Sequence, residues 1–585
     1  MKRLYYKISL LTITLIALYS CKEEFLEEFP KGVVTIDTLS DEAGANLLLI
    51  GAYSLIDGVS QGGPGGAGEA SATNWVWGDV PSDDMHRGDQ TGGWSAINLI
   101  ERYEVDSTNP WVEGLWAANF DGVARANDVL RVIRNAGDAI PIEKANQIEA
   151  EARWLRAWFH FQLRTKIEKV PYVTEDVIGS EVPNDREIWD DIEADLQWGI
   201  DNKMDEAPTE VGRASRWAAK ALKARVHMFQ NEFDLAKPLL NDIIDKGPFQ
   251  LADHFYDNHD EEKQNNIESI FEVQYTVNDG TPGGWNSGAD HRTLFPRGAD
   301  VGLCCAYSAP SFDLFNAFKV DADGLPLLDT FQDDLLLEDY GLLDTDNFTP
   351  TDELLDPRVD WTIARRGIPF LDWGPMSGGD WMLDQAGMGP FLNKKNMFYK
   401  RNFQTISIAS PTWSAGMNGN NWRLFRLSHV ILWRAEVAAE ENDLETAKNL
   451  VNRIRERAQD DIVMGKISNT SFGASDPIII DENAPAANYK LGLYTAFSDK
   501  EHARKAIRHE TRLEFALEGM RFQDLVRWGI DGQVINKYLE SELEGEKLKW
   551  IQGASYSPGK DDHWPVPLTQ IDLRPDVLTQ DPAYN

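Results

Sequence analysis

The sequence predicts a mainly α-helical fold, in which a scaffold of paired helices carries a large loop-rich inserted subdomain. Three observations support this prediction. Apolar residues recur at spacings of three and four, as Trp154, Trp158 and Phe161 do within residues 143–167. A helix–turn–helix pattern rich in small residues occurs twice. Between about residues 250 and 420 the helical periodicity fades, and Gly, Pro, Asn, Asp and Trp dominate.

The predicted helices follow one another with short turns between them. A tetratricopeptide-like helical pair spans residues 216–244, and its alanines allow two helices to approach closely. A second pair in the same style spans residues 427–457. The gaps between the copies are irregular, so we expect a decorated array and not a uniform solenoid. The predicted helical stretches are residues 41–56, 111–135, 143–167, 186–203, 216–230, 235–244, 427–441, 444–457 and 498–529.

The N-terminus has the features of a secretory signal. Three basic residues precede an apolar run at residues 8–18, which is too short to span a bilayer. The run ends in Leu18-Tyr19-Ser20-Cys21, which resembles the lipobox of bacterial lipoproteins, where the cysteine is acylated. An ordinary signal with an incidental cysteine is the alternative. Lys22-Glu23-Glu24 resembles a surface-export signal of Bacteroidetes lipoproteins, and a solvated tether is the other interpretation.

The composition sets the rest of the organisation. Besides Cys21 the chain has only the adjacent Cys304 and Cys305, which form either a strained vicinal disulfide or two buried thiols. The fold must therefore depend on its core. We predict a signal peptide at 1–20, a lipidated N-terminus and tether at 21–40, an N-terminal helical scaffold at 41–250, a loop-rich ligand-binding subdomain at 251–420, and a C-terminal helical part at 421–585 that completes the scaffold.

Charge and missing motifs exclude several functions. The formal charge is −38, and removal of the signal, which carries +3, leaves −41, so we expect no nucleic-acid partner. A nominal Gly-x-Gly-x-x-Gly at Gly63 contains a proline and follows no predicted strand, which argues against a nucleotide site. Asp321 and Asp323 supply only half of a calcium loop. We therefore predict no metal site and no cofactor, and the sequence leaves room for a structural calcium ion elsewhere.

Several motifs occur in a characteristic order. They include Ala152-Arg153-x-Leu155-Arg156-Ala157-Trp158, Asp356-Pro357-Arg358, the long stretch at 507–529, and Pro565-Val566-Pro567 near the C-terminus. Together they resemble the SusD/RagB family of outer-membrane nutrient-binding lipoproteins, nearly end to end. The resemblance implies a tetratricopeptide-like fold, a partnership with a SusC-type TonB-dependent transporter, and capture of oligosaccharides at the cell surface. Some members of the family take peptides instead.

Three glutamates on one helix face offer a catalytic alternative. Glu510, Glu514 and Glu518 are spaced by four, and Arg521 and Asp524 continue the row. Two such carboxylates could act as acid and base in glycoside hydrolysis. Alternating charges on one face favour a mutual ion network instead. We therefore predict that the protein is not an enzyme, with a glycoside hydrolase as a remaining alternative.

Aromatic residues in the loops are the predicted ligand-binding set. An indole ring covers the apolar face of a sugar, while neighbouring polar groups bind its hydroxyl edges. Neighbouring glycines leave such rings uncovered. Each ring has the alternative role of a core residue that anchors its loop. The predicted site residues are Trp75, Trp77, Asp83, Trp94, Trp285, Asn286, Trp373, Asp380, Trp381 and Trp413.

We therefore predict a lipid-anchored outer-membrane protein, facing the cell exterior, that captures a neutral glycan by aromatic stacking and delivers it to a SusC-type transporter. A peptide-binding member of the same family is the first alternative. A helical-repeat adaptor without a small ligand is another.

Overall fold

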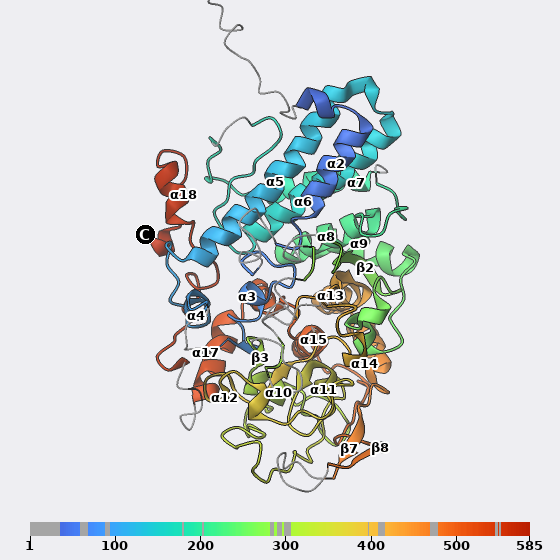
Figure 1. The fold of residues 1–585 in the computed structure, drawn as a ribbon, viewed down its shortest axis with the longest axis vertical. Helices are drawn as coiled ribbons and strands as arrows, with labels where there is room; N and C mark the ends of the chain where they lie inside the picture. Colours follow the sequence, from blue (N-terminus) through green and yellow to red (C-terminus); the bar gives the residue numbers. More distant parts are fainter. Residues whose placement is uncertain are drawn as a thin grey trace, which may run out of the picture.

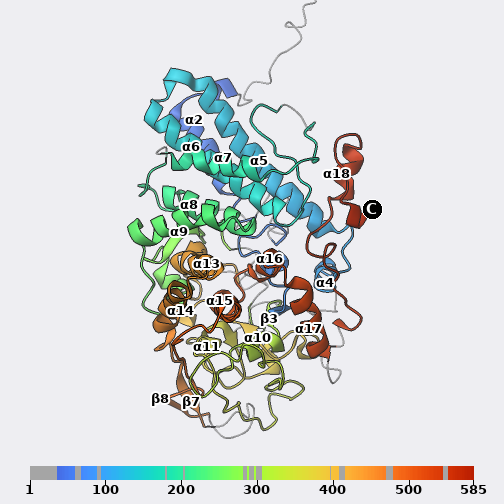
Figure 2. The same ribbon diagram turned by 180° about the vertical axis from the view of Figure 1, so that it is seen from behind.

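The structure is a computed structural model, shown from two sides in Figures 1 and 2, and it has the predicted mainly helical fold. Long helices occupy one end of the elongated molecule, and short elements and loops occupy the other. The structure describes residues 36–585 except 59–67, 88–93, 178–180, 202–203, 281–285, 289–294, 298–305, 396, 408–415, 469–477, 544–547 and 549–550. Cys21, Cys304 and Cys305 therefore lie outside the described residues.

The helical end begins with α2 (Glu42–Tyr53), which packs on α5 (Pro110–Ala136) and α6 (Ile142–Arg164). Asn109 starts α5, because its side chain accepts a hydrogen bond from the backbone N–H of Trp111 at 2.9 Å. The two long helices approach closely where Gly122 faces the ring of Phe159, since a Cβ at Gly122 would lie 2.5 Å from that ring. Helix α7 (Trp189–Ile200) also packs on α6.

The two predicted helical pairs are neighbours in space. Helices α8 (Arg216–Phe229) and α9 (Phe233–Lys246) form the first pair, and α13 (Leu427–Glu440) and α14 (Leu444–Ala458) form the second. Helix α9 packs against α13, so segments about 200 residues apart continue one array. The turn of each pair contains an asparagine with positive φ, Asn231 at 58° and Asn442 at 64°, a conformation that asparagine tolerates. The predicted pairing is confirmed.

The predicted helix over 498–529 is interrupted. Helix α15 (Lys500–Phe515) ends before Leu517 and Gly519, whose φ angles are 63° and 74°, and α16 (Arg521–Arg527) follows. The prediction of one helix is therefore wrong. Gly519 is required at the break, because a Cβ there would lie 2.0 Å from the carbonyl oxygen of Thr73.

Strands hold the loop-rich part to the scaffold. Strand β2 (Ser269–Val273) pairs antiparallel with β6 (Trp422–Arg426), which joins both ends of the intervening segment. That segment has a small core of its own, around Phe370, Trp381 and Phe398. The predicted domain limits remain a prediction. The other elements are α3 (Trp75–Gly78), β1 (Met85–His86), α4 (Ala96–Glu101), β3 (Ala309–Pro310), α10 (Phe312–Ala317), α11 (Val359–Thr362), β4 (Ile363–Ala364), α12 (Gln385–Met388), β5 (Leu392–Asn393), β7 (Met464–Ile467), β8 (Ile480–Pro485), α17 (Asp531–Leu543) and α18 (Leu568–Leu573).

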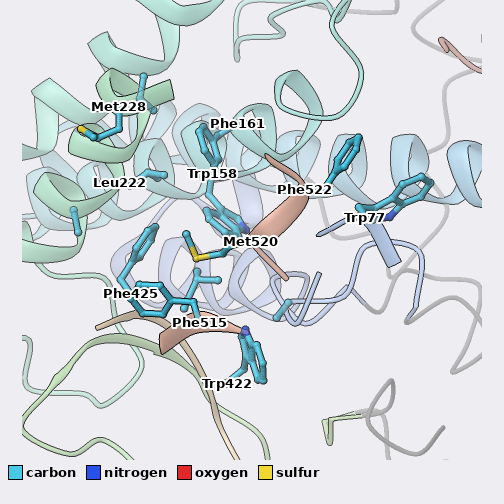
Figure 3. Packing of buried hydrophobic residues seen from close by; sticks show 14 of the residues in the cluster. Trp77, Trp158, Phe161, Leu222, Met228, Trp422, Phe425, Phe515, Met520 and Phe522 are labelled. Carbon is cyan, nitrogen blue, oxygen red and sulfur yellow. The ribbon is translucent and has the colours of Figure 1, made fainter. Parts of the chain in front are cut away.

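The main core joins the scaffold to the C-terminal part. Figure 3 shows Trp158 and Phe161 of α6 in the same packed cluster as Met520 and Phe522. Among the helices of the described ranges, none is both long enough and apolar enough to cross a membrane.

Candidate functional site

Four of the predicted platform tryptophans are core residues. Trp75 and Trp77 on α3 are 2% and 1% exposed, and the Trp77 indole packs against Trp564 with ring centres 5.5 Å apart (Figure 3 shows Trp77). Trp373 and Trp381 are also buried, in the small core of the loop-rich part. The prediction that these four rings are open to solvent is wrong. Trp373 and Trp381 fill the interior of the loop-rich part, which has few helices, whereas Trp75 and Trp77 belong to the main core. In both places tertiary packing covers the rings, so the neighbouring glycines do not leave them open.

Asp83 is also structural. Its side chain is buried and pairs with Arg521 at 2.8 Å and with Arg512 at 3.0 Å. Burial raises the pKa of Asp83, but the two guanidinium charges outweigh this effect and lower the pKa to about 2. The carboxylate therefore links the chain after α3 to helices α15 and α16, and it is not available to a ligand.

The remaining predicted residues lie at several places. Asp380 is exposed and accepts a hydrogen bond from the hydroxyl of Ser377. Asn286 is exposed, and its amide donates to Asp279 at 2.6 Å. The predictions for Trp285 and Trp413 lie outside the described residues. For these residues a ligand-binding role stays a prediction.

Trp94 is a partly exposed member of the predicted set, and it belongs to an aromatic cluster. Its ring centre lies 5.4 Å from that of Trp111 and 6.0 Å from that of Tyr307, and both of these neighbours are buried. The guanidinium carbon of Arg87 lies 4.2 Å from the centre of the Tyr307 ring. We call Arg87, Trp94, Trp111 and Tyr307 the aromatic cluster.

Four elements position the aromatic cluster. Strand β1 pairs with β3, and this pairing places Arg87, which follows β1, beside the chain that contains Tyr307. Trp94 precedes α4 and has a φ of 60°, which is uncommon for a bulky residue and is typical of a site fixed by its surroundings. Trp111 lies in the first turn of α5. A Cβ at Gly68 would lie 2.8 Å from the Trp111 ring, so glycine is needed at this position.

A buried charged group adjoins the cluster along the chain. His86, the residue before Arg87, has its two ring nitrogens 3.0 Å from Glu101 and 3.2 Å from Glu542. Burial lowers the pKa of His86, but hydrogen bonds to the two glutamates raise it to about 9. His86 is therefore a cation at neutral pH, and it ties β1 to α4 and α17. These contacts fix the strand that leads directly to Arg87.

Sequence reasoning missed three members of the cluster. Trp111 was expected only as the start of a helix, and neither Arg87 nor Tyr307 was predicted. Arg87 lies next to a glycine-containing segment that also leads to Trp94, and this proximity was the available signal. Tyr307 comes from more than 200 residues away, and only the β1–β3 pairing reveals its place.

The three glutamates of α15 and its C-terminal break form the ion network that the charge pattern favours. Glu514 is fully buried and binds Arg426 at 2.6 Å and Arg358 at 3.1 Å. Glu510 pairs with Arg358 and Glu518 with Arg426, at 2.7 and 2.9 Å. Burial raises the pKa of Glu514, and the surrounding guanidinium charges reverse the shift and lower it far below its ordinary value. A carboxylate in this state neither faces a substrate nor donates a proton.

Comparison with known families identifies the class of protein that has this helical fold. A model of the SusD family matches residues 267–584, and a second, described as starch-binding associating with outer membrane, matches residues 55–228. The chain therefore belongs to the SusD/RagB family.

One individual relative matches nearly the whole chain, and another matches about half of it. It is 23% identical to the SusD-like protein P25 of Formosa agariphila over 99% of both chains, and 24% identical to a SusD-like protein of Bacteroides ovatus over 47% of this chain and 50% of the other. Solved structures with the same fold include a SusD superfamily protein from Bacteroides vulgatus (TM-score 0.66, 19% identity, 93% and 99% of the two chains). A laminarin-binding SusD-like protein is also similar (TM-score 0.65, 20% identity, 93% and 100%).

Proposed function

We propose that this protein captures oligosaccharides at the cell surface and passes them to a SusC-type TonB-dependent transporter, with Cys21 as its lipid anchor. The aromatic cluster carries this proposal. The accessible part of Trp94 offers an apolar surface for the C–H face of a sugar ring, and the buried Trp111 and Tyr307 rings keep it in place. Membership of the SusD family supports the proposal, as does the likeness to a protein whose name states that it binds laminarin.

The binding step is tested by titration calorimetry with neutral oligosaccharides, beginning with laminarihexaose, and with short peptides as a parallel arm. We expect Trp94→Ala to weaken glycan binding by about 10-fold or more, which corresponds to about 1.4 kcal/mol. Trp198→Ala is the matched control, because Trp198 is also partly buried but lies outside the aromatic cluster, on α7. Its ring centre is 5.1 Å from the guanidinium carbon of Arg153. Equal losses in both variants would contradict a site at Trp94. Binding of peptides and not of glycans would identify the peptide-binding alternative.

The delivery step is tested in membranes. Detergent-solubilised outer membranes should yield the protein together with a TonB-dependent transporter after affinity purification. The Cys21→Ala variant should leave the membrane fraction, because it lacks the acyl chains that hold the protein there. A variant that remains in the membrane fraction would contradict the lipid anchor. Wild-type protein that purifies from these membranes without a transporter would contradict the partnership.

A further inference from the structure

The C-terminal segment returns to the end of α6, far from the aromatic cluster in sequence. The backbone N–H of Trp564 donates to the carbonyl of Lys166 at 2.7 Å, which brings His563 beside Glu168. The hydroxyl of Tyr584 donates to the carbonyl of His563, also at 2.7 Å, and Asp581 caps the short helix that contains Tyr584. Three segments therefore meet at His563.

The side chains at this meeting point form a compact group of metal-binding types. One ligand atom each from Glu168, His563 and Asp581 can be chosen so that all three lie within 4.8 Å of one another. The Nε2 atom of His563 lies 3.4 Å from Asp581 and 3.8 Å from Glu168. This nitrogen is buried and has no hydrogen-bond partner among the described residues. A buried ring nitrogen therefore points at two carboxylates without a hydrogen bond to either.

The other ring nitrogen explains the orientation. Nδ1 of His563 lies 2.7 Å from a carboxylate oxygen of Asp562. An N–H donated to Asp562 leaves the lone pair of a neutral imidazole on Nε2, facing the two acids. Histidines that bind metals are commonly held in this way, by a carboxylate on the nitrogen remote from the ion. The nearby Lys560 pairs with Asp561 at 3.5 Å and not with these acids.

We propose that Glu168, His563 and Asp581 bind a divalent transition-metal ion, Zn²⁺ by preference, which fastens the C-terminal segment to the end of α6. One imidazole and two carboxylates match the ligand types and number of a tetrahedral zinc site that keeps one position for water. Calcium fits less well, because it takes six to eight oxygen ligands. The proposal is independent of glycan binding.

A second group of the same residue types lacks the orienting acid and serves as the comparison. In Glu193, His227 and Glu232, both carboxylates face Nδ1 of the histidine, at 3.7 and 2.7 Å. The nitrogen that faces the acids there is the one already hydrogen-bonded to Glu232. We therefore expect no tight metal binding at His227.

The competing occupant of the His563 site is a proton. An imidazolium at this position would form ion pairs with the surrounding acids. Burial lowers the pKa of His563, and Asp562 together with the other carboxylates reverses the shift and raises it. The experiment must therefore distinguish a metal ion from a proton.

The test uses the full mature chain, stripped with a chelator and titrated with ZnCl₂ at pH 7.5, with CaCl₂ as a second arm. We expect one equivalent of zinc, a higher unfolding temperature with zinc than with calcium, and reversal by the chelator. Glu168→Gln should lower the affinity at least 10-fold without harm to the fold, because this side chain is 46% exposed. Asp562→Asn keeps all three ligands and should lower the affinity about 10–100-fold.

His227→Gln should leave the zinc stoichiometry and affinity unchanged. Circular dichroism of each variant checks that it is folded. Failure of the wild-type chain to bind zinc at micromolar concentrations would overturn the proposal and leave the proton as the occupant. Unchanged zinc binding in Glu168→Gln and Asp562→Asn would also overturn it, since it would place the ion elsewhere.

Discussion

Replacement of Glu514 by glutamine tests whether the glutamates of α15 stabilise the fold. Removing one partner of a buried ion pair costs about 3–5 kcal/mol, because it leaves an uncompensated charge in the interior. Glu514 contacts three guanidiniums, those of Arg358, Arg426 and Arg457. Each of them keeps another carboxylate, for example Asp356 at 2.8 Å from Arg358. We therefore expect the lower end of the range, about 3 kcal/mol.

The assay is urea unfolding followed by tryptophan fluorescence, with the midpoint shift multiplied by the m-value. Glu501→Gln is the matched control, because Glu501 lies in the first turn of the same helix but is 62% exposed. Its contact with Arg504, at 3.6 Å, is long and lies at the surface. It should change the free energy of unfolding by less than about 0.5 kcal/mol. A Glu514→Gln protein as stable as the control would refute the reasoning. Release of sugar ends by wild-type protein, lost in this variant at unchanged stability, would indicate catalysis instead.

Three further predictions concern stability. His86→Gln should lower the free energy of unfolding by about 3 kcal/mol at or below pH 6.5, because the pKa of His86 is raised from 6.5 to about 9 in the folded protein. The difference from wild type should shrink as the pH rises and vanish above about pH 9, which urea unfolding at several pH values can measure. Gly519→Ala should lower the free energy of unfolding by at least about 2 kcal/mol, because φ is 74° at this position and the new Cβ would collide with the Thr73 carbonyl. A thermal unfolding temperature equal to that of the wild type would contradict this. Asp443→Ala should lower the free energy of unfolding by about 1 kcal/mol, measured in urea, because Asp443 caps α14 by accepting a hydrogen bond from the N–H of Thr446 at 3.2 Å. An unchanged free energy would mean that water replaces this cap.

The scaffold could be predicted because its signals are local. The helical pairs at 216–244 and 427–457 follow from apolar periodicity and from the short turns within them. The break between α15 and α16 could not be read from periodicity, because charged residues continue the helical spacing through Gly519. The break depends on two residues that are distant in sequence. Thr73 lies against Gly519, and the Asp79 carboxylate accepts a hydrogen bond from the Gly519 N–H at 3.0 Å.

The candidate site was harder to predict than the scaffold, for a physical reason. A tryptophan beside glycines looks alike in sequence whether its ring faces solvent or fills a small core. Trp373 and Trp94 both have glycine neighbours, yet Trp373 is 7% exposed and Trp94 is partly open. What distinguishes them is the set of partners from other parts of the chain. For Trp94 these partners are Trp111 and Tyr307, and only the tertiary structure brings them together.

The β2–β6 pairing has a consequence for how such proteins diversify. Both ends of the segment between Val273 and Trp422 are fixed in a single ladder, with Val273 opposite Trp422. Inside this segment, Arg358 and Tyr307 also contact the rest of the chain, through the ion network of α15 and the aromatic cluster. Length and sequence can therefore vary most freely in the parts of the segment that lie away from these contacts, where a change moves neither the two strands nor the scaffold.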